Sequence, residues 1–166
     1  FSLTCKAGFD LGVSGISCSP FIPTHYSTIS IIAGDVANFF GPHCANGISG
    51  TIKLIIDGPV QFIAPAPGAL VPAGISGDTI TYLISDFGVV STFSDFRIIA
   101  QTDTFATNGT QVCFKAIVFY SGNDNNTNND SLEQCFSVRT SFDPNDKEVY
   151  PSGPIDISGN RWLTYT

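Results

Sequence analysis

The sequence predicts an all-β protein in which two antiparallel sheets pack against each other. Glycine (16) and proline (10) are abundant and methionine is absent, a composition that favours strands and turns over helices. Several segments alternate apolar and polar residues with a period of two, the pattern of a half-buried strand. Turn residues separate these segments. Together the observations predict an immunoglobulin-like antiparallel β-sandwich of about seven strands.

The segments that alternate supply the expected core. In residues 50–57, Ile52, Leu54 and Ile56 are expected to face inward, with Lys53 and Asp57 toward water. Four further segments follow the same pattern: 9–17 (Phe9, Leu11, Val13), 26–33 (Ile29, Ile31), 78–85 (Ile80, Tyr82, Ile84) and 94–101 (Phe96, Ile98, Ala100).

Residues 111–120 and 131–140 form the last expected hairpin, and its register can be argued. Lys115 must face water, so Cys113 shares its outer face. An antiparallel pairing that sets Cys113 opposite Cys135 also sets Lys115 opposite Glu133. The register therefore predicts a Cys113–Cys135 disulfide on the outer face. The other members of the two strands are expected to divide into core (Val112, Phe114, Ala116, Val118, Phe136, Val138) and outer face (Ile117, Phe119, Ser137, Arg139). The residues between them, 121–130, are expected to form an exposed turn.

Five cysteines occur without a CxxC pair, and only two histidines accompany them, so zinc spacing is poor. Disulfides are expected instead, which implies an oxidising, extracellular setting. Cys18–Cys44 is the expected second pair, with Cys5 left over. A Cys5–Cys18 pair is the open alternative.

The chain divides into four expected parts. Residues 1–8 are interpreted as a segment from an upstream region, and residues 9–140 as the sandwich. Residues 141–160 contain three prolines and are interpreted as an extended linker. Alternation resumes in 161–166, which is expected to be an orphan strand. It would be either the first strand of a following module or a donor strand that completes a neighbour's sheet through Trp162, Leu163, Thr164 and Tyr165.

Charge and hydropathy exclude several partners. The net charge is −7, and the seven Lys and Arg residues are scattered, so we expect no nucleic-acid binding. No apolar run is long enough to span a bilayer, so no membrane insertion is expected.

Catalysis is not expected. His25 and His43 lie in turn sequences, and no GxSxG elbow or matching acid accompanies either of them. No cofactor is predicted either, although calcium is considered because Asp143, Asn145 and Asp146 offer hard oxygen ligands. Residues 124–135 fail the EF-hand pattern, since the sixth and twelfth positions hold Asn129 and Cys135. Solvated turns explain both segments more simply.

Surface glycans are candidate partners and candidate modifications of this chain. A sugar site would use exposed aromatic residues flanked by Asp, Asn or Gln, and the candidates are Phe39, Phe40, Phe93 and Trp162. Three Asn sequons begin at Asn108, Asn125 and Asn129.

The stretch "SFDPNDKEVYPSG" (141–153) followed by "LTYT" (163–166) resembles the DPNDK junction of large secreted surface proteins of Bacteroidota, exported by the type IX secretion system. The resemblance implies a cell-surface or filamentous module, often part of an adhesin, which joins an immunoglobulin-like domain to the next domain. It also implies O-glycans at Asp-Ser/Thr-apolar triplets, here at Thr79, Ser131 and Thr104.

The predicted function is therefore structural or adhesive. The chain would be a non-catalytic module of a long extracellular protein, with neighbouring modules or subunits of the same protein as partners and assembly head-to-tail by strand addition. The alternative is a carbohydrate-binding module of a secreted multidomain protein.

Overall fold

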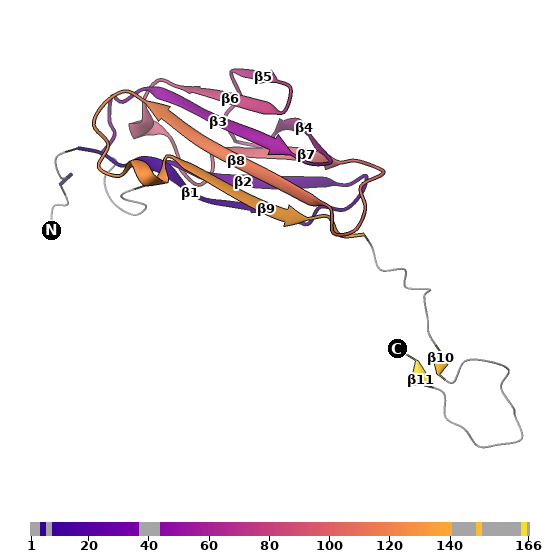
Figure 1. Cartoon of the computed structure of the whole chain (residues 1–166). Coiled ribbons are helices and arrows are strands. Elements are labelled where there is room, and N and C mark those ends of the chain that lie inside the picture. Colours follow the sequence, from indigo (N-terminus) through magenta and orange to yellow (C-terminus); the bar gives the residue numbers. More distant parts are fainter. Residues whose placement is uncertain (1–3, 6–7, 37–43, 141–148, 151–163, 166) are drawn as a thin grey trace, which may run out of the picture.

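A computed structural model of the chain describes residues 4–5, 8–36, 44–140, 149–150 and 164–165. Two antiparallel sheets form the layers of a sandwich (Figure 1). The four-stranded sheet runs, in spatial order, β1 (Leu11–Cys18), β2 (Tyr26–Asp35), β7 (Arg97–Thr102) and β4 (Val60–Pro65). The five-stranded sheet runs β5 (Gly74–Ser76), β6 (Thr79–Ile84), β3 (Gly50–Asp57), β8 (Gln111–Tyr120) and β9 (Ser131–Ser137). Two short 3-10 helices, η1 (Phe87–Val89) and η2 (Thr127–Asn129), lie in loops.

The predicted fold class is confirmed, with two more strands than expected in the sandwich. The sequence pattern did not predict β4 and β5. All the alternating core residues named above are buried except Phe136, which is partly buried against the core. Aromatic rings link the two layers: Tyr82 of β6 meets Phe96 edge-on, with ring centroids 5.2 Å apart.

Strand β1 departs from simple alternation. Leu11 and Val13 are buried as expected, but the register with β2 shifts between Val13 and Gly15. The bulge adds one residue to the strand and so reverses the phase of the alternation beyond it. As a result Ile16 enters the core, where strict alternation would have pointed Ser17 inward.

The loop 121–130 is exposed as predicted, but it also holds the start of the first strand. The Asp124 carboxylate accepts a hydrogen bond from the Leu11 backbone N–H at 2.8 Å. The Asn125 N–H donates to the Phe9 carbonyl at 2.9 Å, and the Asn129 side chain donates to Asp10 at 2.8 Å. The first two bonds satisfy backbone groups of Leu11 and Phe9 at the edge of the sheet, where the described residues place no further strand beside β1.

The Cys113–Cys135 disulfide is present, and the two residues are directly opposed in the β8–β9 ladder, as are Lys115 and Glu133. The Cys18–Cys44 prediction is wrong, and so is the Cys5–Cys18 alternative, because Cys44 bonds Cys5 and Cys18 is free.

The reason for the second pairing is the β1–β2 ladder. It sets Cys18 opposite Ile29 at one end of the strands, whereas Leu11 lies opposite Asp35 at the other end. The Asp35 carboxylate accepts hydrogen bonds from the backbone N–H groups of Cys44 and Ala45, which keeps Cys44 at the Asp35 end. Cys18 is therefore a whole strand away, about 20 Å. Cys5, from the part interpreted as an upstream segment, is bonded to the sandwich instead.

The C-terminal strand is not an orphan. Thr164–Tyr165 (β11) pairs antiparallel with Val149–Tyr150 (β10), which falls inside the expected linker. The prediction of an unpaired strand was wrong because residues 141–160 show no alternation that would mark the short strand before it. The calcium candidates Asp143, Asn145 and Asp146, and the donor-strand residues Trp162 and Leu163, lie outside the described residues.

Tyr82 gives a first prediction. Its hydroxyl is buried without a hydrogen-bond partner among the described residues, so Tyr82→Phe should raise the free energy of unfolding by about 1 kcal/mol. Tyr120→Phe is the control: it removes the 2.9 Å bond to Asp130 and should lower that free energy by about 1 kcal/mol.

Burial also raises the pKa of Tyr82 from 10.0 to about 12, so its neutral form is favoured in the folded state. Wild type should therefore lose stability between pH 10 and 12 more steeply than Tyr82→Phe in urea titrations. Equal urea midpoints for Tyr82→Phe and wild type would contradict the claim that the Tyr82 hydroxyl is buried without a hydrogen-bond partner.

Candidate functional site

Groups able to do acid–base or metal chemistry are dispersed in the described part of the chain. His25 is exposed, and its Nδ1 lies 2.9 Å from the carbonyl of Pro23. One close group of potential metal ligands is found there, Cys113, Glu133 and Cys135, but both sulfurs are joined in the disulfide. A disulfide sulfur is a poor metal ligand because it carries no thiolate charge. His43 lies outside the described residues. None of the helical turns described has the length and hydrophobicity of a membrane-spanning helix.

Cys18 lies in a hollow of about 250 Å³ between the outer strands β1 and β9, beside Phe21, Phe136 and Arg139. Burial raises the pKa of its thiol to about 11. The thiol is therefore protonated at neutral pH and is a weak nucleophile. Cys18 behaves as a small apolar residue rather than as a reactive group.

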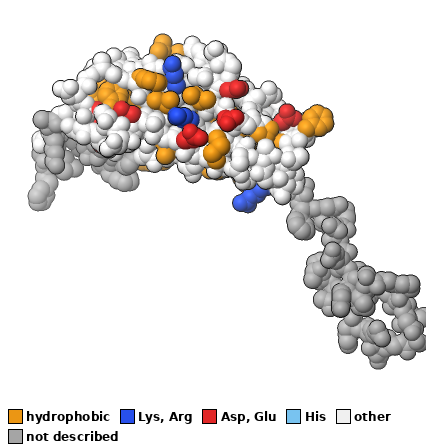
Figure 2. Space-filling view, viewed as in Figure 1, with side chains coloured by type: hydrophobic (Ala, Val, Ile, Leu, Met, Phe, Trp, Pro, Cys, Tyr) orange, Lys and Arg blue, Asp and Glu red, His pale blue; other side chains and the backbone are white. Residues whose placement is uncertain are grey.

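The outer face of the five-stranded sheet combines apolar and charged side chains, and we call it the lysine face (Figure 2). It is the side of β6, β3, β8 and β9 that points away from the core. The outward residues of those strands include Leu83, Thr81, Thr79, Thr51, Lys53, Ile55, Asp57, Phe119, Ile117, Lys115 and Glu133, together with the Cys113–Cys135 disulfide.

Two neighbouring rows of the lysine face place apolar groups beside a cation. Leu83, Thr51 and Phe119 are directly opposed across three strands, and Leu83 and Phe119 are 70% and 46% exposed. In the next row Lys53 lies opposite Ile117. The Lys53 ammonium lies 5.3 Å from the centroid of the Phe119 ring, within cation–π range. The side chains thus form an apolar patch with a positive charge held at its centre.

A hollow of about 200 Å³ continues the lysine face toward β9. Its lining combines a disulfide sulfur with one cation and two carboxylates: Ile55, Asp57, Cys113, Lys115 and Glu133. Because Lys115 and Glu133 are both exposed and directly opposed, their attraction is screened by water and adds little stability. These charges are therefore available to a partner.

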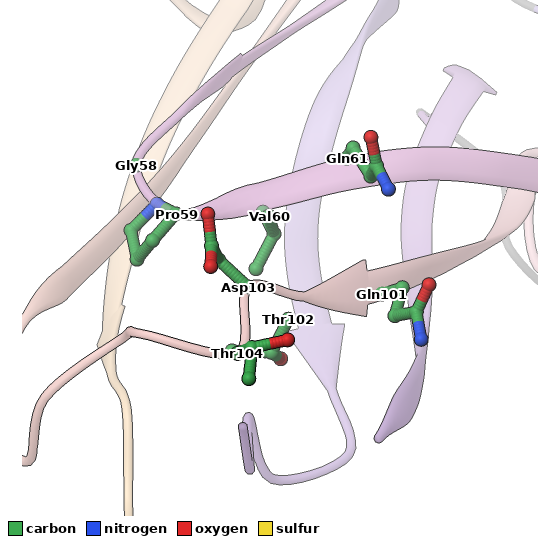
Figure 3. A pocket seen from close by; sticks show the side chains of 8 residues that line it. All are labelled: Gly58, Pro59, Val60, Gln61, Gln101, Thr102, Asp103 and Thr104. Carbon is green, nitrogen blue, oxygen red and sulfur yellow. The ribbon is translucent and has the colours of Figure 1, made fainter. Parts of the chain in front are cut away.

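A second surface lies on the other sheet, and we call it the amide groove (Figure 3). It has a volume of about 330 Å³ and is formed where β4 begins and β7 ends. Its lining is Gly58, Pro59, Val60, Gln61, Gln101, Thr102, Asp103 and Thr104. The ladders set Gln61 opposite Gln101, and Gln101 opposite Tyr26, which is 63% exposed. Opposed residues share a face of the sheet, so the aromatic ring and two carboxamides form one row.

The glycosylation candidates are all in described segments. Ser131, Thr104, Asn108 and Asn125 are exposed, whereas Thr79 is half-buried on β6. Thr104 lines the amide groove, and Thr79 lies opposite Ile55 on the lysine face. Sugar attached at either position would cover part of one of the two surfaces.

No protein-family profile matches this sequence, and no curated protein is similar to it. Among solved structures, the chain is similar to the sixth cohesin of scaffoldin B from Acetivibrio cellulolyticus, solved in complex with a Cel5 dockerin double mutant. The two share 14% sequence identity with a TM-score of 0.44, over 81% of this chain and 95% of that chain.

Sequence reasoning found part of the lysine face and missed the amide groove. Alternation placed Lys53, Lys115, Ile117 and Phe119 on outer faces, where they lie. Of the proposed sugar-site aromatics, Phe93 is 48% exposed but does not line the groove, and Phe39, Phe40 and Trp162 lie outside the described residues. The row in the groove joins strands that are not consecutive in the sequence, so no local pattern signals it.

Proposed function

We propose that this chain is a non-catalytic interaction module of an extracellular protein. It would dock a neighbouring module or a second copy of the same protein through the lysine face. The observation that carries the proposal is the pair of exposed apolar residues Leu83 and Phe119, which flank Thr51 in one row of a sheet face, beside Lys53. Large exposed apolar side chains gathered on one face of a domain are typical of protein-binding surfaces.

Charge supports a partner of the same kind. The chain has a net charge of −7, whereas on the lysine face Lys53 and Lys115 balance Asp57 and Glu133. The excess negative charge therefore belongs to the rest of the chain, and a second copy offers carboxylates to Lys53 and Lys115. Contact between two different surfaces of identical modules is head-to-tail and extends into a row of modules.

The disulfides support an extracellular location. The two disulfides, Cys5–Cys44 and Cys113–Cys135, are bonds that persist in oxidising compartments. Three further points are proposals that rest on the sequence resemblance. They are membership of the Bacteroidota surface proteins, export by type IX secretion, and glycans on Thr79, Thr104 or Ser131. Thr164–Tyr165 is paired within the chain, so we assign assembly to the lysine face and not to a donated strand.

Sedimentation velocity over a range of protein concentrations and salt tests the proposal. Wild type should self-associate, and association should weaken in high salt because the lysines are screened. Leu83→Ser and Phe119→Ser should each weaken association by about tenfold, the effect of withdrawing one large apolar side chain from an interface.

Val89→Ser is the matched control, because Val89 is 78% exposed and lies in η1, outside the four strands that form the lysine face. It should leave association unchanged. The lysine face is excluded as the contact between copies if the chain stays monomeric at all concentrations. It is also excluded if Val89→Ser weakens self-association as much as Leu83→Ser and Phe119→Ser do.

A further inference from the structure

We propose that the amide groove, together with Tyr26, binds a neutral oligosaccharide. The site is on the four-stranded sheet, on the opposite side of the sandwich from the lysine face, and so it adds a second binding function to the module. Its volume of about 330 Å³ is at the lower end of the usual range for small-ligand sites. That size suits a short stretch of sugar rings.

The side chains of the groove match the chemistry of a sugar. Each sugar hydroxyl both donates and accepts, and a carboxamide such as Gln61 or Gln101 offers both functions from one planar group. The C–H face of a sugar ring is apolar and packs on an aromatic ring, which the exposed Tyr26 provides in the same row. Figure 3 shows the Gln61, Gln101 and Asp103 side chains in the groove with the Thr104 side chain beside them.

Backbone hydrogen bonds fix these polar groups before a ligand arrives. The Gln101 amide donates to the Thr24 carbonyl at 3.1 Å, and its oxygen has no hydrogen-bond partner among the described residues. The Asp103 Oδ1 accepts from the Phe105 N–H at 2.9 Å, while the Asp103 N–H donates to the Pro59 carbonyl at 2.8 Å. Groups held in place lose little conformational freedom when they bind, which favours affinity.

Thr102 lines the groove but does not offer its side chain to a ligand. It is only 1% exposed and alternates along β7 with the core residues Ile98 and Ala100, so its hydroxyl, which has no hydrogen-bond partner in the described part of the chain, faces the core. The groups available to a sugar are therefore the outward Gln61 and Gln101 and the exposed Asp103 and Thr104.

The charges around the groove select a neutral ligand. Among the described strands of the four-stranded sheet, the cationic residue is Arg97. Its guanidinium donates to the carbonyls of Ser94 (2.9 Å) and Pro67 (3.0 Å). Asp103 and the net charge of −7 repel an anionic sugar. The ligand is therefore expected to carry hydroxyls and no carboxylates or sulfates.

The experiment is an NMR titration of the full ¹⁵N-labelled chain. The probes are neutral hexasaccharides of β-1,4-linked glucose, mannose and xylose, with an oligogalacturonate as the anionic comparison. At least one neutral probe should shift the side-chain amide signals of Gln61 and Gln101 and the backbone signal of Asp103. Tyr26→Ala and Gln101→Met should each weaken that binding at least about tenfold, a loss typical of one essential contact.

Two further variants separate binding from folding and from the proposed function. Tyr26→Phe keeps the ring and should bind within about twofold of wild type. Phe119→Ser, on the lysine face, should leave the sugar titration unchanged even though it weakens self-association. The proposal is overturned if no neutral probe moves the groove signals, if the oligogalacturonate binds better, or if Tyr26→Ala folds and binds like wild type.

Discussion

Replacement of Gly50 by alanine is expected to lower the free energy of unfolding by about 3 kcal/mol, the upper end of the cost of overpacking a core. Gly50 begins β3 and is paired on both sides, with Ile84 of β6 and Tyr120 of β8. A Cβ at this position would lie 2.1 Å from the Phe119 carbonyl oxygen and 2.9 Å from a carbon of the Phe87 ring. The oxygen belongs to the backbone of β8, so relief of the clash requires the two strands to separate.

Urea unfolding of Gly50→Ala and Gly74→Ala measures the effect. Gly74 is also the first residue of a strand, β5, but a Cβ there meets no atom within 4 Å. Gly74→Ala should therefore change stability by less than about 0.5 kcal/mol, the usual range for exposed substitutions. If the two alanine variants unfold at the same urea concentration, the close approach of β3 and β8 is not as described.

Sequence analysis placed correctly the residues of strands that bury one face, because such strands alternate apolar and polar residues. Residues 50–57 were predicted to the residue as a strand, since an antiparallel strand of a sandwich has a single apolar side. β4 breaks this rule. Its register with β7 shifts between Phe62 and Ala64, which leaves Ile63 unpaired and 42% exposed, so the alternation is interrupted. β5 has only three residues and all are exposed, so no apolar pattern marks it.

Pairing between distant segments explains what could not be predicted of the sites. The Cys113–Cys135 pair lies in one hairpin, and its register follows from the residues of two consecutive strands. The Cys5–Cys44 pair depends on where the β1–β2 ladder puts its ends. The row of Tyr26, Gln101 and Gln61 joins β2, β7 and β4, whose order in space differs from their order in the chain. Local patterns give the face on which a residue lies, but not its neighbours on that face.

Removal of the Cys113–Cys135 disulfide, in the double variant Cys113→Ala/Cys135→Ala, is expected to lower the free energy of unfolding by about 3 kcal/mol. The two cysteines are separated by 22 residues, and in the loop-entropy model a cross-link of that span restricts the unfolded chain by this amount. The folded state should change little, because the β8–β9 ladder extends on both sides, from Gln111–Ser137 to Ile117–Ser131.

The slope of the urea transition, measured together with its midpoint, separates an effect on the unfolded state from an effect on the folded state. The unfolded chain without the cross-link exposes more surface, so the slope should rise while the midpoint falls. Cys18→Ala is the control, since Cys18 is the free cysteine and its replacement leaves the cross-links in place. A lower midpoint with an unchanged slope would locate the effect in the folded hairpin. In that case the disulfide would be holding β9, the outermost strand of its sheet, against β8 rather than constraining the unfolded chain.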